Sequence, residues 1–182
     1  MRRYLLLIVG TVLWVAADQW SKIAMVDWLV IGDLPEKAQN ISSRVHVVSE
    51  AFFKFRVVGN PGAAWGLFRG LPDSLRVPFF VLISLVAIGA IGSLYHRARD
   101  DQRLLKWALT FVLGGAIGNL IDRIRTGYVI DFVEWSYYEH TWPNFNVADV
   151  AISLGVGLIV LEMILDRKRD DEVQKTAQPP SA

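Results

Sequence analysis

The sequence predicts an integral membrane protein that is mainly α-helical, with four transmembrane helices and a small β-rich extramembrane element on the outer side. Hydrophobic residues make up 53% of the 182 residues, and the mean hydropathy is +0.33. Four apolar runs are long enough to cross a hydrocarbon core, which needs about 20 helical residues. These runs cover approximately residues 4–26, 75–95, 107–124 and 147–165.

The segments between these runs predict the rest of the domain. Residues 29–74 contain turn-forming residues and short alternating stretches, so we expect this outer loop to hold the β-rich element. A second outer segment, residues 125–146, contains the extended-looking stretch 128–135. The transmembrane domain therefore covers residues 1–165. Residues 166–182 are charged and then rich in Gln, Pro and Ser, which predicts a disordered cytoplasmic tail.

Basic residues predict the orientation of the chain. Three groups lie beside the spans, all at one end of a four-span protein: Arg2, Arg3, Arg97, Arg99, Arg103, Lys106, Arg167, Lys168 and Arg169. The positive-inside rule makes that end cytoplasmic, although basic residues in the outer loops reduce the contrast. Both termini are therefore expected inside. A cleavable signal peptide is the alternative for the first run, but its apolar character continues to Ile31.

Two acidic residues, Asp131 and Asp149, lie in otherwise apolar stretches, YVIDFVEW and FNVADVAISLGVGLIVL. An ionisable residue at membrane depth is energetically costly and usually has a function. Two carboxyl groups brought together in a poorly hydrated site share one proton, so the pair can act as acid and base. This is the chemistry of aspartyl hydrolysis.

Helical spacing predicts that polar residues of different spans meet at one depth. With a rise of about 1.5 Å per residue, the polar residues lie about 20 to 27 Å from the basic residues at the inner ends of their spans. These polar residues are Asp18, Asn119 and Asp149. Asp131 follows the third span in an apolar stretch that should pack back against the membrane surface. It can therefore reach the level of Asp149.

The first and third spans carry further candidate residues. Asp18 and Lys22 are four residues apart and share a helical face, which favours an interfacial ion pair with a supporting structural role. In the third span, Asn119, Asp122 and Arg123 share a face just after a glycine-rich stretch that should allow close helix packing. We expect Asn119 and Arg123 to have a binding role. Alternatively, Asp122 and Arg123 could simply neutralise each other.

The fourth span and the first outer loop complete the set. Asn146 and Asp149 suit a helix N-terminus, so capping alone is one interpretation of Asp149. Asp149, Ser153 and Gly157 lie on one helical face, which favours an intramembrane site instead. Asn60 lies in a turn and can donate to and accept from peptide backbone.

Together these stretches resemble the bacterial lipoprotein signal peptidases, also called signal peptidase II. Five motifs in family order carry the resemblance: Asp18-Gln19 with Ser21-Lys22, Asn60 with Gly62 and Ala64, Gly118-Asn119 with Asp122-Arg123, Asp131-Phe132, and Phe145-Asn146 with Ala148-Asp149. They cover nearly all of the chain before the tail.

The resemblance implies an aspartyl endopeptidase of the bacterial cytoplasmic (inner) membrane. It would remove the signal peptide of a prolipoprotein just before a diacylglyceryl-modified cysteine, with Asp131 and Asp149 as the catalytic dyad. The substrate-binding residues would be Asn60, Asn119, Arg123 and Asn146. The supporting residues would be Asp18, Lys22 and Asp122. Expected partners are the prolipoprotein and membrane lipids, and the enzyme would work as a monomer without a cofactor, a metal or nucleic acid.

Other functions are less consistent with the sequence. The chain has no cysteine, its three histidines lie on different segments, and it contains no H-E-x-x-H pair, so a metalloprotease is disfavoured. A small ion-coupled transporter or channel subunit would need acidic groups along a whole pathway. The inner halves of the spans carry almost no charge apart from Glu162. A structural scaffold would leave Asp131 unexplained. We also expect the loop 29–74 to close over bound peptide, with Trp65 or Phe68 touching lipid.

Overall fold

A computed structural model describes residues 2–62 and 72–177 and contains four long helices. Their bounds are α1 Arg2–Leu29, α2 Asp73–Arg97, α3 Arg103–Thr126 and α4 Val147–Ala177. Each includes a segment long and apolar enough to cross a membrane. The predicted mainly α-helical membrane protein with four spans is confirmed. Trp65 and Phe68 lie outside the described residues.

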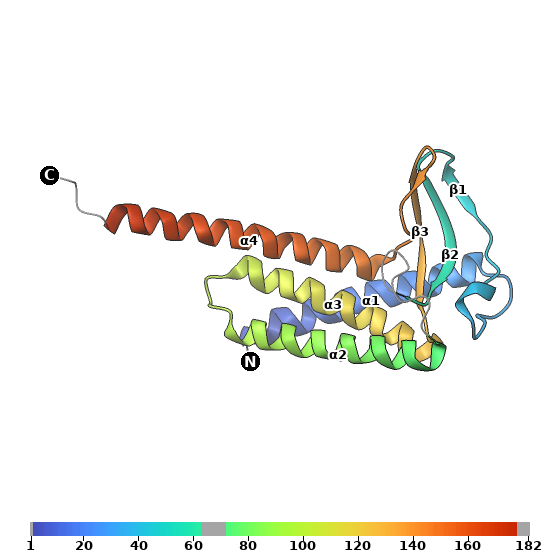
Figure 1. Ribbon diagram of the computed structural model, residues 1–182, viewed down its shortest axis with the longest axis horizontal. Helices are drawn as coiled ribbons and strands as arrows, with labels where there is room; N and C mark the ends of the chain where they lie inside the picture. The colour runs from blue at the N-terminus through green and yellow to red at the C-terminus, as the bar shows by residue number, and fades with distance from the viewer. Residues whose placement is uncertain (1, 63–71, 178–182) are drawn as a thin grey trace.

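The helices run along the long axis of the molecule, and a sheet lies across one end of them (Figure 1). We call the end that carries the sheet the outer end. α1 begins and α4 ends at the opposite end, as expected for an even number of spans. There Arg3 donates two hydrogen bonds of 2.6 Å to the carbonyl groups of His96 and Ala98, which ties the start of α1 to the end of α2.

α3 is the central helix and packs against α1, α2 and α4. Its small residues allow the close approach. A Cβ atom added at Gly114 would meet the side chain of Trp14 in α1, and one added at Gly115 would meet the backbone carbonyl of Ala148 in α4. Gly155 makes a similar approach from α4 to the α3 backbone. Helices in lipid associate through such contacts, so the predicted packing role of the glycines is confirmed.

α4 extends beyond its apolar span, in contrast to the disordered tail predicted from Asp166 onward. The helix continues to Ala177. Arg169 pairs with Asp166 at 2.8 Å and lies 4.0 Å from Glu162, so charged residues on successive turns support the extension. A composition typical of disorder can therefore still form helix when it prolongs an existing one. Residues 178–182 lie outside the described part of the chain.

The outer end is an antiparallel sheet built from both outer segments. Its strands, in sheet order, are β1 His46–Ser49, β2 Phe53–Asn60, β3 Val129–Tyr137 and β4 His140–Thr141. The sequence predicts a β-rich first segment, and β1 and β2 confirm it. The second segment supplies β3 and β4. In the pairing of β2 with β3, Val58 lies opposite Asp131 and Asn60 lies opposite Val129.

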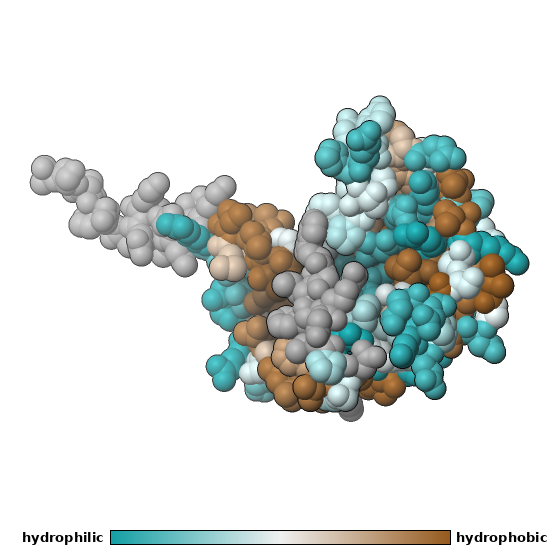
Figure 2. All heavy atoms as spheres, turned by 45° about the vertical axis from the view of Figure 1, so that its right-hand side comes forward, coloured by the Kyte–Doolittle hydropathy of each residue, from teal (hydrophilic) through white to brown (hydrophobic). Residues whose placement is uncertain are grey.

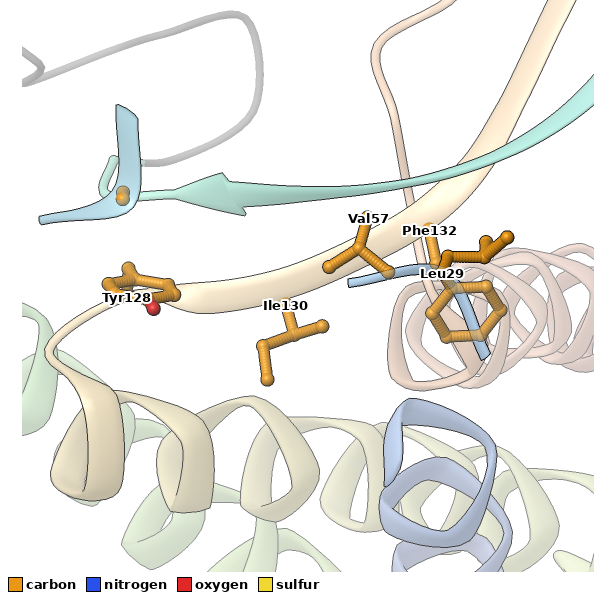
Figure 3. Close-up of a cluster of buried hydrophobic side chains, with 6 residues drawn as sticks. Leu29, Val57, Tyr128, Ile130 and Phe132 are labelled. Carbon is orange, nitrogen blue, oxygen red and sulfur yellow. The ribbon is translucent and has the colours of Figure 1, made fainter. Parts of the chain in front are cut away.

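The side chains of β3 alternate between a core face and a pocket face. Ile130 and Phe132 point toward the helices in Figure 3. They belong to a buried cluster formed by Leu29, Val57, Tyr128, Ile130 and Phe132. Burying each aliphatic or aromatic member stabilises the sheet on the bundle by about 1.5–3 kcal/mol. Successive residues of a strand point to opposite faces, so Asp131 faces away from this cluster.

Large apolar side chains cover the outside of the bundle. Leu5 of α1, Leu82 of α2, and Leu154 and Met163 of α4 are all at least half exposed. In Figure 2 the surface of α4 between its charged end and the sheet is largely hydrophobic. Such a surface suits hydrocarbon, where the helical backbone satisfies its own hydrogen bonds.

We expect Gly115→Ala to lower the unfolding temperature in detergent, measured by circular dichroism. The added methyl group meets the Ala148 carbonyl, which is backbone and can move only if α3 and α4 separate. Overpacking of this kind costs about 1–3 kcal/mol. Gly157→Ala in α4 is the matched control, because nothing lies within 4 Å of its added Cβ. Equal unfolding temperatures for the two variants would contradict the packing argument.

Candidate active site

Asp131 and Asp149 line one pocket, although one lies on a strand and the other on a helix. β3 places Asp131 on its pocket face, and the first turn of α4 carries Asp149. The pocket has a volume of about 990 Å³, and Asn60, Asn119 and Arg123 also line it. Asp131 is only 1% exposed. We refer to Asp131 and Asp149 as the aspartate pair.

Three asparagines hold the aspartate pair. Asn60 Nδ2 donates to Asp131 Oδ2 at 3.0 Å, and Asn146 Nδ2 donates to Asp131 Oδ1 at 2.7 Å. Asn119 Nδ2 donates to Asp149 Oδ1 at 2.8 Å, and the backbone N–H of Asn146 donates to Asp149 Oδ2 at 3.1 Å. Each of the four carboxyl oxygens therefore accepts one N–H. The pair is oriented while each oxygen keeps a further lone-pair direction.

Asp149 is also part of the N-terminal cap of α4. Asn146 Oδ1 accepts from the Asp149 N–H at 3.0 Å, while Asp149 Oδ2 accepts from the Asn146 N–H. This reciprocal arrangement is a capping box, with Asn146 at the N-cap and Asp149 three residues later. The capping interpretation and the site interpretation of Asp149 therefore describe the same geometry. A cap lets the helix fix the carboxyl group rigidly.

The end of β2 directs Asn60 toward Asp131. The Asn60 Oδ1 atom accepts from the N–H of Gly62 at 3.1 Å, in an Asx-type turn. That bond turns the Nδ2 atom toward Asp131. The register of β2 with β3 brings the two residues to neighbouring positions.

Lys22 forms the centre of a buried charged cluster beside the pair. Its Nζ atom lies 2.9 Å from Asp18 Oδ2 and 2.7 Å from Asp122 Oδ2. The exposed fractions are 2% for Lys22, 0% for Asp18 and 3% for Asp122. The predicted Asp18–Lys22 ion pair is therefore present, and the structure adds that it is buried, which a sequence spacing does not reveal because a neighbouring helix covers it. Asp122 forms its ion pair with Lys22. The alternative in which Asp122 and Arg123 neutralise each other is therefore wrong.

The two acids of this cluster also hold backbone near the aspartate pair. Asp18 Oδ1 accepts from the Ala148 N–H at 2.9 Å, one of the unpaired donors in the first turn of α4. Asp122 Oδ2 accepts from the Ile130 N–H at 3.0 Å, next to Asp131. α1 and α3 thus position the residues adjoining both members of the pair.

Gln19 is a residue whose contribution the sequence reasoning missed. Its Nε2 atom donates to Asp18 Oδ2 at 3.1 Å and to Asp122 Oδ1 at 3.0 Å, linking the two acids. Its adjacency to Asp18 was the available signal. Trp135 and Trp142 line the pocket as well, with ring centroids 6.4 Å apart. The sequence spacing of the two tryptophans does not predict that they line the pocket, since their positions depend on the turn between β3 and β4.

Arg123 lies on the wall of the pocket next to Asn119. Its guanidinium carbon is 4.9 Å from the centre of the Phe80 ring, a cation–π contact with α2. Its Nη1 atom donates to the Asn119 carbonyl at 3.4 Å. Arg123 also lines the pocket, and its guanidinium group carries donors only.

Burial raises the pKa of Asp131 from its usual 3.8 to about 8, and the neighbouring Asp149 carboxyl adds to the rise. The hydrogen bonds from Asn60 and Asn146 and the positive charge of Lys22 oppose it. Desolvation is the largest cause of the raised pKa. Because this pKa lies above neutral pH, Asp131 keeps a proton there. Among the described residues, no group of three or more His, Cys, Asp or Glu side chains is arranged to hold a metal ion.

A family model described as signal peptidase (SPase) II matches residues 10–165, which include every residue of the site. The chain belongs to the signal peptidase II family. It is therefore an aspartic peptidase of the membrane that acts on lipoprotein signal peptides, and the transporter alternative is not supported.

Individual signal peptidase II relatives agree with this assignment. The chain is 41% identical over 166 residues to a lipoprotein signal peptidase of Anaeromyxobacter sp. (strain Fw109-5), covering 81% of this chain and 79% of the relative. It is 40% identical over 157 residues to that of Syntrophotalea carbinolica, covering 86% and 89%.

Two solved structures of bacterial membrane enzymes have the same fold as this signal peptidase II. One superposes with a TM-score of 0.72 at 26% identity, covering 97% of this chain and 93% of that one. The other gives 0.68 at 28% identity, covering 86% and 91%. The sheet-capped four-helix architecture is therefore shared with experimentally determined enzymes.

We expect stability to fall as pH rises from about 4 to 8. In this window folded signal peptidase II holds a proton on Asp131 that the unfolded chain has released, so raising the pH favours unfolding. Above about pH 8 the effect levels off. Asp131→Asn removes the carboxyl group that titrates. As the pH is raised from 5 to 9, the unfolding temperature of this variant should therefore rise relative to that of the parent. Parallel curves for parent and variant would refute this assignment.

The matched control for that measurement is Asp101→Asn. Asp101 is exposed, and its hydrogen bond with Arg99 lowers the pKa of its carboxyl group. Between pH 5 and pH 9 its carboxyl group is therefore ionised in both the folded and the unfolded chain. The unfolding curve of this variant should therefore run parallel to that of the parent.

Proposed function

We propose that this enzyme cleaves the signal peptide of a prolipoprotein just before the diacylglyceryl-modified cysteine, using Asp131 and Asp149 as a catalytic dyad that activates water. The observation that carries the proposal is the buried aspartate pair in one pocket, with each carboxyl oxygen held by an N–H. Family membership supports the substrate class. The two carboxyl groups supply acid and base without a covalent intermediate.

The raised pKa of Asp131 suggests how the pair divides the reaction. Protonated Asp131 would polarise the scissile carbonyl group, while ionised Asp149 takes a proton from the attacking water. The water oxygen bonds to the carbonyl carbon and forms a tetrahedral intermediate. Collapse of this intermediate breaks the C–N bond, and the proton on Asp149 passes to the leaving amine. The products are the signal peptide carboxylate and the lipoprotein with a free amino group on its cysteine.

The polar residues around the pair would position it and bind the substrate. Asn60, Asn119 and Asn146 donate to the carboxyl groups and keep them at a fixed orientation. Arg123 has donors toward the pocket that could bind the peptide carbonyl groups or the ester groups of the modified cysteine. The buried charged cluster would support this arrangement; its members are Asp18, Lys22 and Asp122.

The extent of the pocket suggests how a lipid-modified substrate binds. Val150, Ser153 and Leu154 line it along α4, within the span, while Trp135 and Trp142 line it at the sheet. A diacylglyceryl chain could therefore remain in the bilayer while the peptide lies against the dyad. The outer loop 29–74 would close over the bound peptide. Function as a monomer is part of this proposal, because one chain supplies both carboxyl groups and the asparagines that hold them.

The distribution of basic residues supports a location in the bacterial inner membrane with both termini cytoplasmic. Arg3, Arg97, Arg99 and Arg103 lie at the end of the bundle opposite the sheet. The sheet and the pocket would then face the periplasm, where prolipoproteins emerge. Residues 1–165 would form the peptidase domain, with 29–74 and 125–146 as its outer segments.

Separate Asp131→Asn and Asp149→Asn substitutions should each reduce cleavage of a diacylglyceryl-modified prolipoprotein by about a hundredfold or more, because each removes one proton-transfer group. Cleavage is measured by gel mobility of the purified precursor, with folding checked by circular dichroism. Asp101→Asn, at the opposite end of the bundle, is the matched control and should cleave at the parent rate. Full activity of either dyad variant would eliminate the proposed mechanism.

The rate of cleavage should depend on pH through two ionisations. Activity requires one proton on the pair, so it should decline as pH rises through about 8, where Asp131 loses its proton. It should also decline in acid, where both carboxyl groups are protonated. Initial rates between about pH 4 and 10 test this expectation. A profile with a single ionisation would be inconsistent with a shared proton.

A further inference from the structure

We propose that Lys22 is a positioning residue for the dyad: its ammonium group holds the Asn119 carboxamide with the NH2 group toward Asp149 and keeps a positive charge beside both carboxyl groups. The inference rests on the proposed function, because it assigns Lys22 a part in that reaction. It goes beyond the purely supporting role that the sequence suggests.

The hydrogen-bonding capacity of lysine determines the orientation of Asn119. An ammonium group has three donors and no acceptor. Lys22 Nζ contacts Asp18, Asp122 and, at 3.1 Å, Asn119 Oδ1, so three partners use three hydrogens. Only the oxygen of the carboxamide can face such a donor. The Asn119 nitrogen is consequently turned the other way, toward Asp149 Oδ1 at 2.8 Å.

Lys22 can give one hydrogen to Asn119 Oδ1 without sharing that hydrogen with another acceptor. Asn146 Nδ2 also lies 3.2 Å from Asn119 Oδ1, but its two hydrogens serve three acceptors. The other two are the Ile130 carbonyl at 3.2 Å and Asp131 Oδ1 at 2.7 Å, the shortest of the three. Without Lys22, the carboxamide of Asn119 could turn its oxygen toward the Asp149 carboxyl. That orientation would repel an ionised base.

Lys22 also balances the charges that surround the dyad. α1 contributes Asp18 and Lys22, α3 contributes Asp122 and Arg123, and β2 contributes the neutral Asn60. Removal of the ammonium would leave Asp18 and Asp122 without the positive charge that both contact. The positive charge of Lys22 also opposes the rise in the pKa of Asp131, so its removal should raise that pKa further.

The test compares steady-state kinetics of the parent and Lys22→Met, each as the full chain purified in detergent, on a diacylglyceryl-modified prolipoprotein. We expect kcat to fall by about tenfold or more and KM to change by less than about twofold, since Lys22 does not line the pocket. Both limbs of the pH profile should move upward by roughly one unit, because an opposite charge has been removed.

Lys22→Gln separates the two effects and serves if Lys22→Met does not fold. Its amide can still donate to Asn119 but carries no charge. The pH limbs should shift upward as in Lys22→Met, while kcat should fall less.

Asp18→Asn is the matched control for disruption of the charged cluster. It breaks the same ion pair with Lys22, but Asp18 does not contact Asn119. Because this change removes a negative charge, the pH limbs should stay in place or move downward. General loosening of the structure would move the limbs of Asp18→Asn and Lys22→Met in the same direction.

The proposal is overturned if Lys22→Met lowers the unfolding temperature but leaves kcat and the pH limbs of the folded protein unchanged. It is also overturned if Asp18→Asn and Lys22→Met shift the limbs in one direction. Failure of the proposed function looks different: Asp131→Asn or Asp149→Asn would then retain cleavage, whatever the Lys22 variants do.

Discussion

The buried ammonium group of Lys22 is the interaction on which the outer end of this protein depends. It binds Asp18 and Asp122, and these acids in turn accept the backbone N–H groups of Ala148 and Ile130. α1, α3, the start of α4 and the start of β3 are thereby joined at one point. A buried ion pair adds little to stability because its desolvation is costly. Here it specifies where the two segments that carry the aspartate pair lie.

The bilayer explains why this polar cluster is so completely paired. Four helices with apolar outer surfaces associate through close packing, and Gly114, Gly115 and Gly155 bring α3 against its neighbours. Charged groups between such helices have no water to satisfy them, so each needs protein partners. Satisfying them fixes the helices in register. The need of these buried charges for protein partners therefore also determines how the helices align at the outer end, where the site lies.

Different structural elements hold the two carboxyl groups of the aspartate pair. Asp149 lies in the first turn of a helix, where N–H groups stabilise a negative charge, and its cap with Asn146 holds it in place. Asp131 lies on a strand and is almost fully buried, which favours its protonated form. Under the proposed mechanism, the strand would carry the acid and the helix would carry the base.

The four spans and the two candidate acids, Asp131 and Asp149, could be predicted without a structure, because hydrophobic length and a carboxylate in an apolar run are local properties. It also indicated a common depth for Asp18, Asn119 and Asp149, since helical rise is constant. The pairing of β2 with β3 and the burial of the Asp18–Lys22 pair could not be predicted in this way. Strand register, helix coverage and the direction of an amide depend on contacts between distant segments, which no local pattern encodes.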